Sequence, residues 1–447
     1  MAHRRFWNIA AVLKWTAGAL FAGAFLAACS STPSGGPVVA QPDRPDVASN
    51  DRPSEDERTR YDRRGFIEPL HMQGEEPVRV ALLLPFSAST EAVQKIASAM
   101  FDAAQLAAFE TGNARFLLIP KDTKGNPTDA AAAARSALAD GAEIILGPLF
   151  AEEVVSVAEV ARSAGVPVIA FSSDVASAGD GVYLLSFPPE LEIARVTDYA
   201  VLHGYSRFGL IAPATDYGER VSNSFAEEIF VRGGVLVHEE RYEQEPSAML
   251  APAKRLAQYA QEVVPVELRH DYSPTAPQNP ADDAGYTRGY QAVLIPEQGT
   301  LLRALAPLFP YYNVNINEIK LLGVSGWNNP RLTREPALKG GWFAAPDPDI
   351  TKAFETRFAA AFGATPPRLS SLSYDATLLA ARLAQAPRKR GRFDESAITD
   401  PNGYFGADGL FRLKDNGSVE RGLAILEIQP DGIRVVDPAP RSFAPSF

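Results

Sequence analysis

The strongest constraint on the fold is a repeated alternation between short apolar runs and longer segments with helical periodicity. Residues 80–84 form a continuous apolar run, which is typical of a strand buried on both faces. In residues 91–110 the apolar side chains recur at helical spacing on one face, and Gly112 stands where a left-handed helix end favours glycine. This order of strand and helix then repeats along the chain. Such alternation predicts an α/β fold of mostly parallel sheets flanked by helices.

The alternation falls into two series, which we interpret as two lobes. Pro188 and Pro189 interrupt the first series, and the next strand pattern starts near residue 208. The 447 residues are enough for two lobes that each bury a core. A polar stretch rich in proline and aspartate, residues 266–290, predicts an exposed insertion. The predicted boundaries assign residues 77–188 and 341–386 to lobe 1, and residues 189–340 and 387–447 to lobe 2.

The C-terminal part has strand signals of a different kind. Residues 409–413, 422–428 and 433–436 alternate between apolar and polar side chains. They are separated by Asp-Asn-Gly at 415–417 and by Pro-Asp-Gly at 430–432, which are signals of hairpin turns. We therefore predict antiparallel strands at this end of the chain.

The N-terminus has the features of an export signal. A basic start with Arg4 and Arg5 precedes an alanine-rich apolar stretch that is short for a membrane span and that ends in small residues. The sequence Leu-Ala-Ala-Cys at residues 26–29 contains the only cysteine of the chain and resembles the bacterial lipobox. That resemblance implies a signal peptide at residues 1–28, cleavage before Cys29, and acylation of its sulfur by chains such as palmitate. The alternatives are a chance cysteine in an ordinary signal peptide and, for the arginine pair, twin-arginine export.

The residues after the cysteine bear on where the protein is held. Ser30 rather than an aspartate follows Cys29, and by resemblance to enteric lipoprotein sorting this favours the outer membrane over the inner membrane. Residues 29–76 are rich in serine, proline, glycine and charged side chains. Such a composition buries too little apolar surface to offset the entropy of ordering the chain. We predict a disordered tether between the lipid anchor and a folded body.

Charge and composition exclude several classes of function. The formal net charge of −11 argues against nucleic-acid binding, because a phosphate backbone requires a basic face. A single cysteine allows no intrachain disulfide, and the five histidines are scattered without ligand spacing, so we expect no metal and no cofactor. The sequence has no Gly-x-Ser-x-Gly motif and no glycine-rich phosphate loop. We therefore expect a binding protein and not an enzyme.

Several short motifs, in their order and spacing, resemble the type I periplasmic binding proteins, which include receptors for branched-chain amino acids. They are LLLPFS at 82–87, DGAEIILGPL at 140–149, AGVPVIAFSSD at 164–174, Asp216-Tyr217-Gly218 and Tyr374-Asp375-Ala376. The resemblance covers residues 78–440 or nearly so. It implies two lobes with mostly parallel sheets, a crossover near residue 188 and a return near residue 341.

Within that superfamily, the lipobox, the tether and residues 403–428 are most similar to the penicillin-binding-protein activator lipoproteins. This resemblance implies a periplasmic lipoprotein that regulates peptidoglycan synthesis by contacting a penicillin-binding protein. The enteric activator has a helical-repeat N-terminal domain where this sequence has only the tether, which leaves the mode of contact open. The alternatives are a small-molecule, amino-acid-like receptor of an ABC transporter or sensor, and a structural envelope protein that binds glycan directly.

Candidate site residues follow the predicted strands, because ligands of open parallel sheets bind outside the carboxyl ends of the strands. In a two-lobed protein those ends line the cleft between the lobes. The candidates are Ser87, Leu149, Phe150, Ser172, Ser173, Asp216, Tyr217, Glu297, Trp327, Tyr374 and Asp375.

The polar candidates each have a functional and a structural interpretation. Ser172 and Ser173 offer hydroxyls to a ligand carboxylate, or they cap a turn. Asp216 and Asp375 accept a hydrogen bond from a ligand ammonium, and Asp216 alternatively caps a helix.

The aromatic and apolar candidates bear on the kind of ligand. Trp327 or Tyr217 packs an aliphatic stem of a ligand, whereas Tyr374 packs between lobes or helices. Leu149 and Phe150 stand just after Gly-Pro, where amino-acid receptors of this superfamily place small hydroxyl residues. Two bulky apolar side chains crowd that grip, which argues against a free amino acid as ligand.

Overall fold

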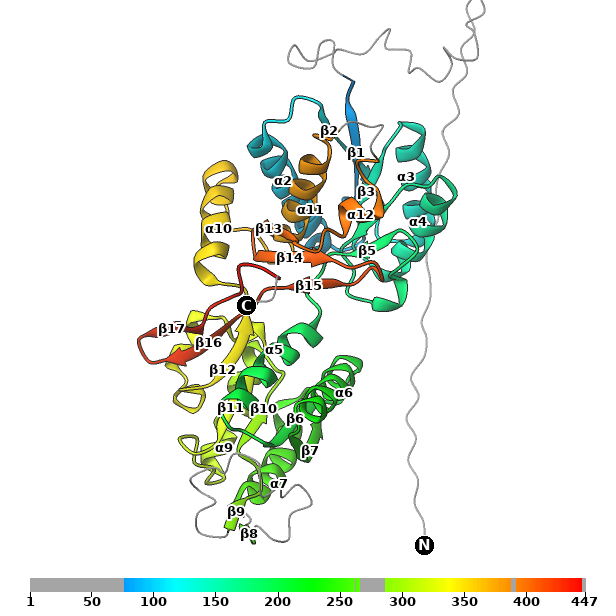
Figure 1. Cartoon of the computed structure of the whole chain (residues 1–447). Helices are drawn as coiled ribbons and strands as arrows, with labels where there is room; N and C mark the ends of the chain where they lie inside the picture. The colour runs from blue at the N-terminus through cyan, green and yellow to red at the C-terminus, as the bar shows by residue number, and fades with distance from the viewer. Residues whose placement is uncertain (1–75, 262, 266–285, 387–390, 444–447) are drawn as a thin grey trace, which may run out of the picture. The chain divides into compact units, whose positions relative to one another are not determined.

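The computed structural model describes residues 76–261, 263–265, 286–386 and 391–443 (Figure 1). The predicted signal peptide, the lipidation of Cys29, nearly all of the tether and most of the predicted insertion lie outside the described residues. Within these ranges no helix combines the length and the apolar character that a membrane span requires.

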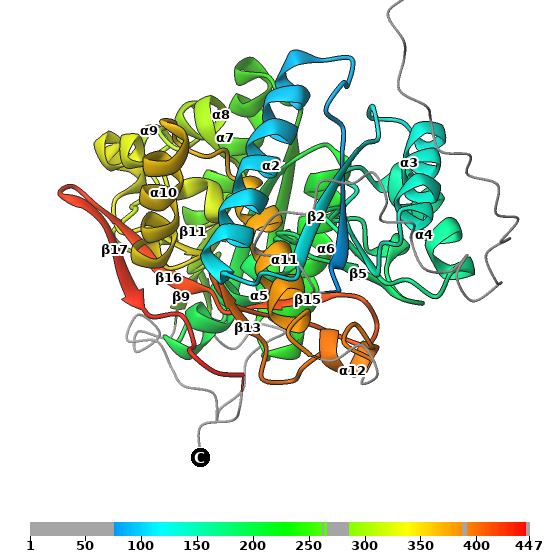
Figure 2. The same cartoon turned by 90° about the horizontal axis from the view of Figure 1, so that it is seen from above.

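Lobe 1 is built on a five-stranded parallel sheet with the order β2-β1-β3-β4-β5. Its strands are β1 (Val78–Leu84), β2 (Phe116–Asp122), β3 (Ile144–Leu146), β4 (Val168–Ala170) and β5 (Val182–Leu184). Helices α2 (Glu91–Thr111) and α11 (Ser370–Leu383) pack on one face, and α3 (Pro127–Ala139) and α4 (Ala151–Ser163) pack on the other (Figure 2). Both faces of β1 are therefore buried, as its continuous apolar run predicts.

Lobe 2 is built on a seven-stranded sheet with the order β17-β16-β12-β11-β10-β6-β7. Five of its strands are parallel: β6 (Arg207–Pro213), β7 (Val235–Tyr242), β10 (Ala292–Leu294), β11 (Lys320–Gly323) and β12 (Trp342–Ala345). Two are antiparallel to their neighbours: β16 (Ala424–Gln429) and β17 (Gly432–Asp437). The helices of this lobe are α5 (Pro189–Leu202), α6 (Asp216–Val231), α7 (Leu250–Gln261), α8 (Gly299–Leu305) and α9 (Leu308–Tyr311), and β8 (Val263–Pro265) pairs with β9 (Tyr286–Arg288).

After β12 the chain returns to lobe 1. It forms α10 (Pro348–Phe362), α11, α12 (Glu395–Ile398) and a small antiparallel sheet of β13 (Tyr404–Gly406), β14 (Gly409–Leu413) and β15 (Val419–Arg421). Tyr404, Phe411 and Leu413 lie in the same apolar core as β1 and α2. The backbone N–H of Leu184 also donates to the carbonyl of Gly417 at 2.8 Å, which ties the turn after β14 to β5.

Two predicted lobe boundaries are therefore wrong. Residues 342–345, predicted in lobe 1, form β12 of the lobe 2 sheet, because β12 pairs with β11 in parallel. Residues 391–421, predicted in lobe 2, pack with lobe 1 through the core and the backbone contact just described. The predicted antiparallel character of the tail is confirmed, but β15 was not predicted, and the turn at 415–417 joins β14 to β15 and not to β16.

Helices α2 and α10 both end at a glycine, which the sequence predicts for α2. Gly112 and Gly363 follow α2 and α10 with φ of 58° and 72°, the left-handed conformation that glycine adopts without strain. Asp347 is the N-cap of α10, and its side chain accepts from the N–H of Asp349 at 3.0 Å.

The chain passes between the lobes three times: between β5 and α5, between β12 and α10, and between β15 and β16. Leu191, at the start of α5, packs against the cores of both lobes. A two-lobed α/β protein with parallel sheets flanked by helices and antiparallel C-terminal strands is thus confirmed.

Candidate functional site

Four polar or aromatic side chains end or follow strands of lobe 2 at one edge of its sheet, the carboxyl ends of the parallel strands, and a carboxylate of α5 lies beside one of them. Tyr242 ends β7, Tyr217 lies in the first turn of α6 after β6, and Glu297 follows β10. Ser325 follows β11, and Glu192 lies in the first turn of α5. In open parallel sheets this edge is where ligands bind.

Glu297 is fixed in place by hydrogen bonds. It is buried, with 6% of its surface exposed, and its carboxylate accepts from the hydroxyl of Tyr242 at 2.7 Å and from the N–H of Gln298 at 2.9 Å. Burial and the bond to Glu297 both raise the pKa of Tyr242, so this hydroxyl remains a donor. The carbonyl of Glu297 in turn accepts from Nε1 of Trp327 at 3.1 Å.

Glu192 and Tyr217 extend this group. The carboxylate of Glu192 accepts from the N–H of Ser325 at 2.8 Å, and burial raises its pKa in spite of that bond. Tyr217 is 39% exposed, and its pKa is raised by burial and by the nearby carboxylates of Glu192 and Glu297. A half-exposed ring beside two carboxylates suits a ligand that carries a positive charge or several N–H donors.

Two predicted residues of lobe 2 have other positions than expected. Trp327 is 0% exposed, its ring lies against Phe343 with 6.4 Å between ring centroids, and it fills the space above Gly323. The prediction that Trp327 packs a ligand stem is therefore wrong. Asp216 is exposed in the first turn of α6, and the helix is capped by Thr215, whose hydroxyl accepts from the N–H of Gly218 at 3.2 Å.

In lobe 1 the polar candidates Ser87 and Ser172 form hydrogen bonds within the loops that follow the strands. Ser87 follows β1, and both its hydroxyl and its N–H donate to Asp122 at the end of β2. Burial raises the pKa of Asp122, but the donors of Ser87 and its neighbours outweigh it and lower the pKa. Ser172 is buried, and its hydroxyl accepts from the N–H of Asp174 at 3.1 Å, as expected of a serine that caps a turn. Ser173 beside it is half-buried.

The loop after β3 presents apolar side chains. Leu149 is half-buried and packs against the core, and Phe150 is 38% exposed and is the N-cap of α4. Glu153, in the first turn of α4, is only 1% exposed and accepts from the N–H of Phe150 at 3.4 Å. Glu153 was missed in the sequence, although a carboxylate three residues after a helix cap is a recognisable capping signal.

Tyr374 packs between helices away from these edges. It is 4% exposed on α11, its hydroxyl donates to Glu110 of α2, and it accepts from Arg357 of α10 at 3.2 Å. Burial and Glu110 raise its pKa to about 12.

Asp375 belongs to a buried cluster at the connections between lobes. It is 0% exposed and accepts from the N–H of Ala407 at 2.6 Å, and a terminal nitrogen of Arg421 lies 3.9 Å from its carboxylate. Arg421, at the end of β15, donates from Nε to the carbonyl of Ser186 at 2.8 Å. Burial and the nearby Asp408 raise the pKa of Asp375 to about 7, against the effect of Arg421. The predicted contact of Asp375 with a ligand is therefore wrong.

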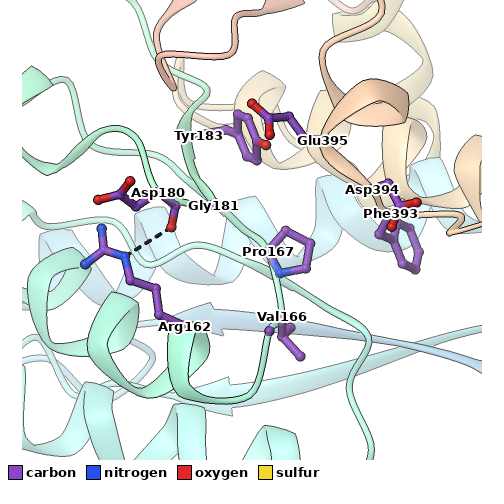
Figure 3. A pocket seen from close by; sticks show the side chains of 10 residues that line it. Arg162, Val166, Pro167, Asp180, Gly181, Tyr183, Phe393, Asp394 and Glu395 are labelled. Atoms are coloured by element: carbon purple, nitrogen blue, oxygen red, sulfur yellow. Dashed lines mark hydrogen bonds between the residues drawn. The ribbon is translucent and has the colours of Figure 1, made fainter.

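A cavity of about 310 Å³ lies at the opposite edge of the lobe 1 sheet (Figure 3). Pro167 and Gly181 in its wall directly precede β4 and β5, so it sits at the amino ends of these strands. The side chain of Arg162 reaches across to the carbonyl of Asp180 at 3.1 Å, and Glu395 faces Tyr183 (Figure 3). None of the candidate residues lines this cavity. Among the described residues, no group of His, Cys, Asp and Glu side chains could hold a metal ion.

The chain belongs to the periplasmic binding protein family, whose model matches residues 77–300. Three solved structures show the same fold. A candidate branched-chain amino acid ABC transporter protein from Rhodospirillum rubrum has a TM-score of 0.64 at 15% identity and covers 80% of this chain and 100% of its own. A solute-binding protein of an ABC transporter from Rhodopseudomonas palustris, in complex with 3,4-dihydroxybenzoic acid, has a TM-score of 0.53 at 16% identity. The match covers 82% of this chain and 97% of that protein. A substrate-binding protein from Desulfitobacterium hafniense, in complex with leucine, has a TM-score of 0.52 at 15% identity. The match covers 81% of this chain and 100% of that protein.

A curated relative, an uncharacterized protein of Rickettsia prowazekii, is 25% identical over 118 residues. The match covers 26% of this chain and 32% of that protein, so it spans about a third of the relative's length. Membership of the family indicates a periplasmic location.

Proposed function

We propose that this protein binds a small organic solute at the carboxyl ends of its lobe 2 strands, as the receptor of an ABC transporter or of a solute sensor. The observation that carries the proposal is the convergence of Glu192, Tyr217, Tyr242, Glu297 and Ser325 on one edge of the sheet. Hydrogen bonds hold both carboxylates before any ligand arrives, and such preorganisation favours binding. The similar structures that hold leucine or an aromatic acid support a solute of this size.

These lobe 2 side chains are suited to a part of the solute that donates hydrogen bonds or carries a positive charge. Glu192 and Glu297 accept hydrogen bonds, and the ring of Tyr217 offers a face to a cation. An ammonium, guanidinium or amide group has the donors that such a group requires.

Thermal shift on the purified full-length protein tests this function. We expect a solute from an amine-containing panel to raise the melting midpoint in a concentration-dependent way, because it binds the folded state only. Glu297→Gln and Tyr242→Phe should each raise the solute concentration needed for the same shift about tenfold or more, in line with loss of a charged hydrogen bond. Glu355→Gln, an exposed change on α10, is the matched control and should leave the response unchanged. A panel that raises the midpoint of all four proteins equally would contradict the assigned site.

The membrane that holds the lipid anchor determines whether this protein can serve a transporter. An acylated Cys29 in the outer membrane, which Ser30 favours, could not readily serve an inner-membrane permease. Mass spectrometry of the membrane-extracted protein, after separation of the two membranes, tests both acylation and location. Acylated protein in the inner membrane supports the transporter role, and acylated protein in the outer membrane supports a role in contact with the cell wall.

The second candidate is regulation of peptidoglycan synthesis by binding a penicillin-binding protein. The observation that favours it is the lobe 1 loop, where Phe150 and Glu153 occupy the position of a grip for an amino-acid carboxylate. Co-purification with the synthase and stimulation of its activity by the full-length protein test this candidate. Deletion that leaves synthase activity and cell-wall composition unchanged would count heavily against it.

A further inference from the structure

We propose that the lobe 1 cavity at the amino ends of β4 and β5 is a second ligand site, which takes a small organic cation with an apolar body. The site shares no side chain with the lobe 2 group described above, and the inference does not depend on the proposed solute-binding function. It follows from the construction of the cavity, from one buried hydroxyl without a partner, and from the charges around the opening.

The cavity is built from three segments that lie far apart in the sequence. The end of α4 contributes Arg162, the turn into β4 contributes residues 165–167, the turn into β5 contributes Asp180 and Tyr183, and the segment that leads into α12 contributes residues 393–395. The volume of about 310 Å³ is at the lower end of the range of about 300–1,000 Å³ that small-molecule pockets occupy. The site therefore forms only in the folded chain and has room for a small solute.

The apolar part of the lining is held in place by the core of lobe 1. Tyr183 is 3% exposed and Phe393 is 8% exposed, and both side chains belong to the same apolar core as β1 and α2. Val166 and Pro167, which also line the cavity, are half-buried. These walls are preformed and partly apolar, which suits the apolar body of a ligand.

The hydroxyl of Tyr183 is a polar group that the protein leaves unused. It forms no hydrogen bond with any of the described residues, although the side chain is almost fully buried. Burial and the charge of Glu395 raise the pKa of Tyr183 to about 12, so the hydroxyl keeps its proton at neutral pH. Tyr183 and Glu395 point toward one another at the cavity (Figure 3). A buried hydroxyl without a partner is unfavourable, and a ligand that hydrogen-bonds to it removes this cost.

The charges around the opening select a cation. Asp180, Asp394 and Glu395 are exposed and line the cavity, and the carboxylate of none of them is paired with another described residue. Arg162, the cationic side chain of the lining, is engaged with the backbone, since its Nε donates to the carbonyl of Asp180 at 3.1 Å and Nη2 to that of Gly179 at 3.4 Å. Three carboxylates against one engaged guanidinium attract an ammonium group and repel a carboxylate.

The polar and apolar parts of the lining together define the ligand. An ammonium group between Glu395 and Tyr183 would donate to the carboxylate of the first and to the hydroxyl oxygen of the second. The apolar body of the same ligand would lie against Pro167 and Phe393. A ligand without the positive charge would satisfy the hydroxyl alone, and a carboxylate would meet three like charges.

Titration calorimetry on the full-length protein with three solutes of similar shape tests this inference. They are phenethylamine, phenethyl alcohol and 3-phenylpropionate, which carry a positive charge, no charge and a negative charge. We expect phenethylamine to bind with a Kd on the order of 1 mM or tighter, about tenfold or more tightly than the alcohol, and 3-phenylpropionate to bind most weakly. Absence of phenethylamine binding, or equal binding of the three solutes, would overturn the inference.

Variants distinguish this cavity from the lobe 2 site. In the background of Glu297→Gln, which weakens the lobe 2 site, Tyr183→Phe and Glu395→Gln should each weaken phenethylamine binding about fivefold or more. Glu159→Gln, an exposed change on α4 outside the lining, is the matched control and should leave binding unchanged.

The outcomes separate this inference from the proposed function. Binding that survives in both cavity variants, or that is lost with Glu297→Gln alone, would overturn the second site and leave the lobe 2 function standing. Glu395 is exposed, so its substitution leaves the core intact, and the melting midpoint of each variant confirms that it is folded.

Discussion

Replacement of Arg421 by methionine should destabilise the protein by an amount that depends on pH. Arg421 is 8% exposed, its Nε donates to the carbonyl of Ser186 at 2.8 Å, and its guanidinium lies 4.5 Å from the ring centre of Phe187. A terminal nitrogen lies 3.9 Å from the carboxylate of Asp375. The substitution removes the donor and the positive charge but keeps much of the apolar volume.

The expected magnitude follows from the charge state of Asp375. Its pKa is raised to about 7, so at pH 5 the folded protein holds it protonated and the substitution costs chiefly the bond to Ser186. That loss is about 1.5–3 kcal/mol. At pH 8 Asp375 is ionised in the unsubstituted protein, and without Arg421 it either stays buried as an unpaired charge or takes up a proton against the pH, which increases the cost to about 3–5 kcal/mol.

Urea denaturation of the full-length protein at pH 5 and pH 8 measures both values. Arg434→Met, at an exposed pair with Asp431, is the matched control and should cost less than about 1 kcal/mol at either pH. In the background of Asp375→Asn, the cost of Arg421→Met should become the same at both pH values. Equal costs at pH 5 and pH 8 in the unsubstituted background would refute the coupling of these two side chains.

Three further predictions concern other parts of the molecule. Gly323→Ala should destabilise by about 1–3 kcal/mol or more, because the added Cβ would lie 2.2 Å from the ring of Trp327, and the midpoint in urea reports it. The pKa of Glu240 is lowered because the donors of Arg255 and His238 outweigh its burial, so its stabilising effect is present above the unfolded pKa near 4.5 and is lost as pH falls through the lower folded value. Glu240→Gln should therefore lower the melting midpoint at pH 7 more than at pH 3, and equal losses would contradict this. Glu110→Gln should weaken the packing of α2 on α10 by about 1–2 kcal/mol, since it removes the charge that pairs with Arg357 of α10 at 2.8 Å, and hydrogen exchange of α2 measures it.

The elements that the sequence predicts correctly are those determined by neighbours along the chain. The apolar run of β1, the helix end at Gly112 and the turn at 430–432 each depend on a few adjacent residues. The assignment of β12 to lobe 2 and of β13 to β15 to lobe 1 depends instead on pairing across the chain, and here the prediction failed. Periodicity alone carries no information on which strand becomes a partner.

The same distinction holds for the candidate site. Tyr217 and Glu297 were found because they directly follow strands. Glu192 was missed, since an acid in a first helical turn is ordinary and its partner Ser325 is 133 residues away. Trp327 was misjudged because its burial depends on the absence of a side chain at Gly323, which only the folded structure reveals.

The contact of Arg421 with Ser186 has a mechanical consequence. Ser186 lies on the first connection between the lobes, and Arg421 stands at the start of the third. A hydrogen bond between two connections couples them, so a rotation of one cannot occur without the other unless this bond breaks. Loss of this bond would therefore uncouple the first connection from the third without altering Tyr217, Glu192 or Glu297.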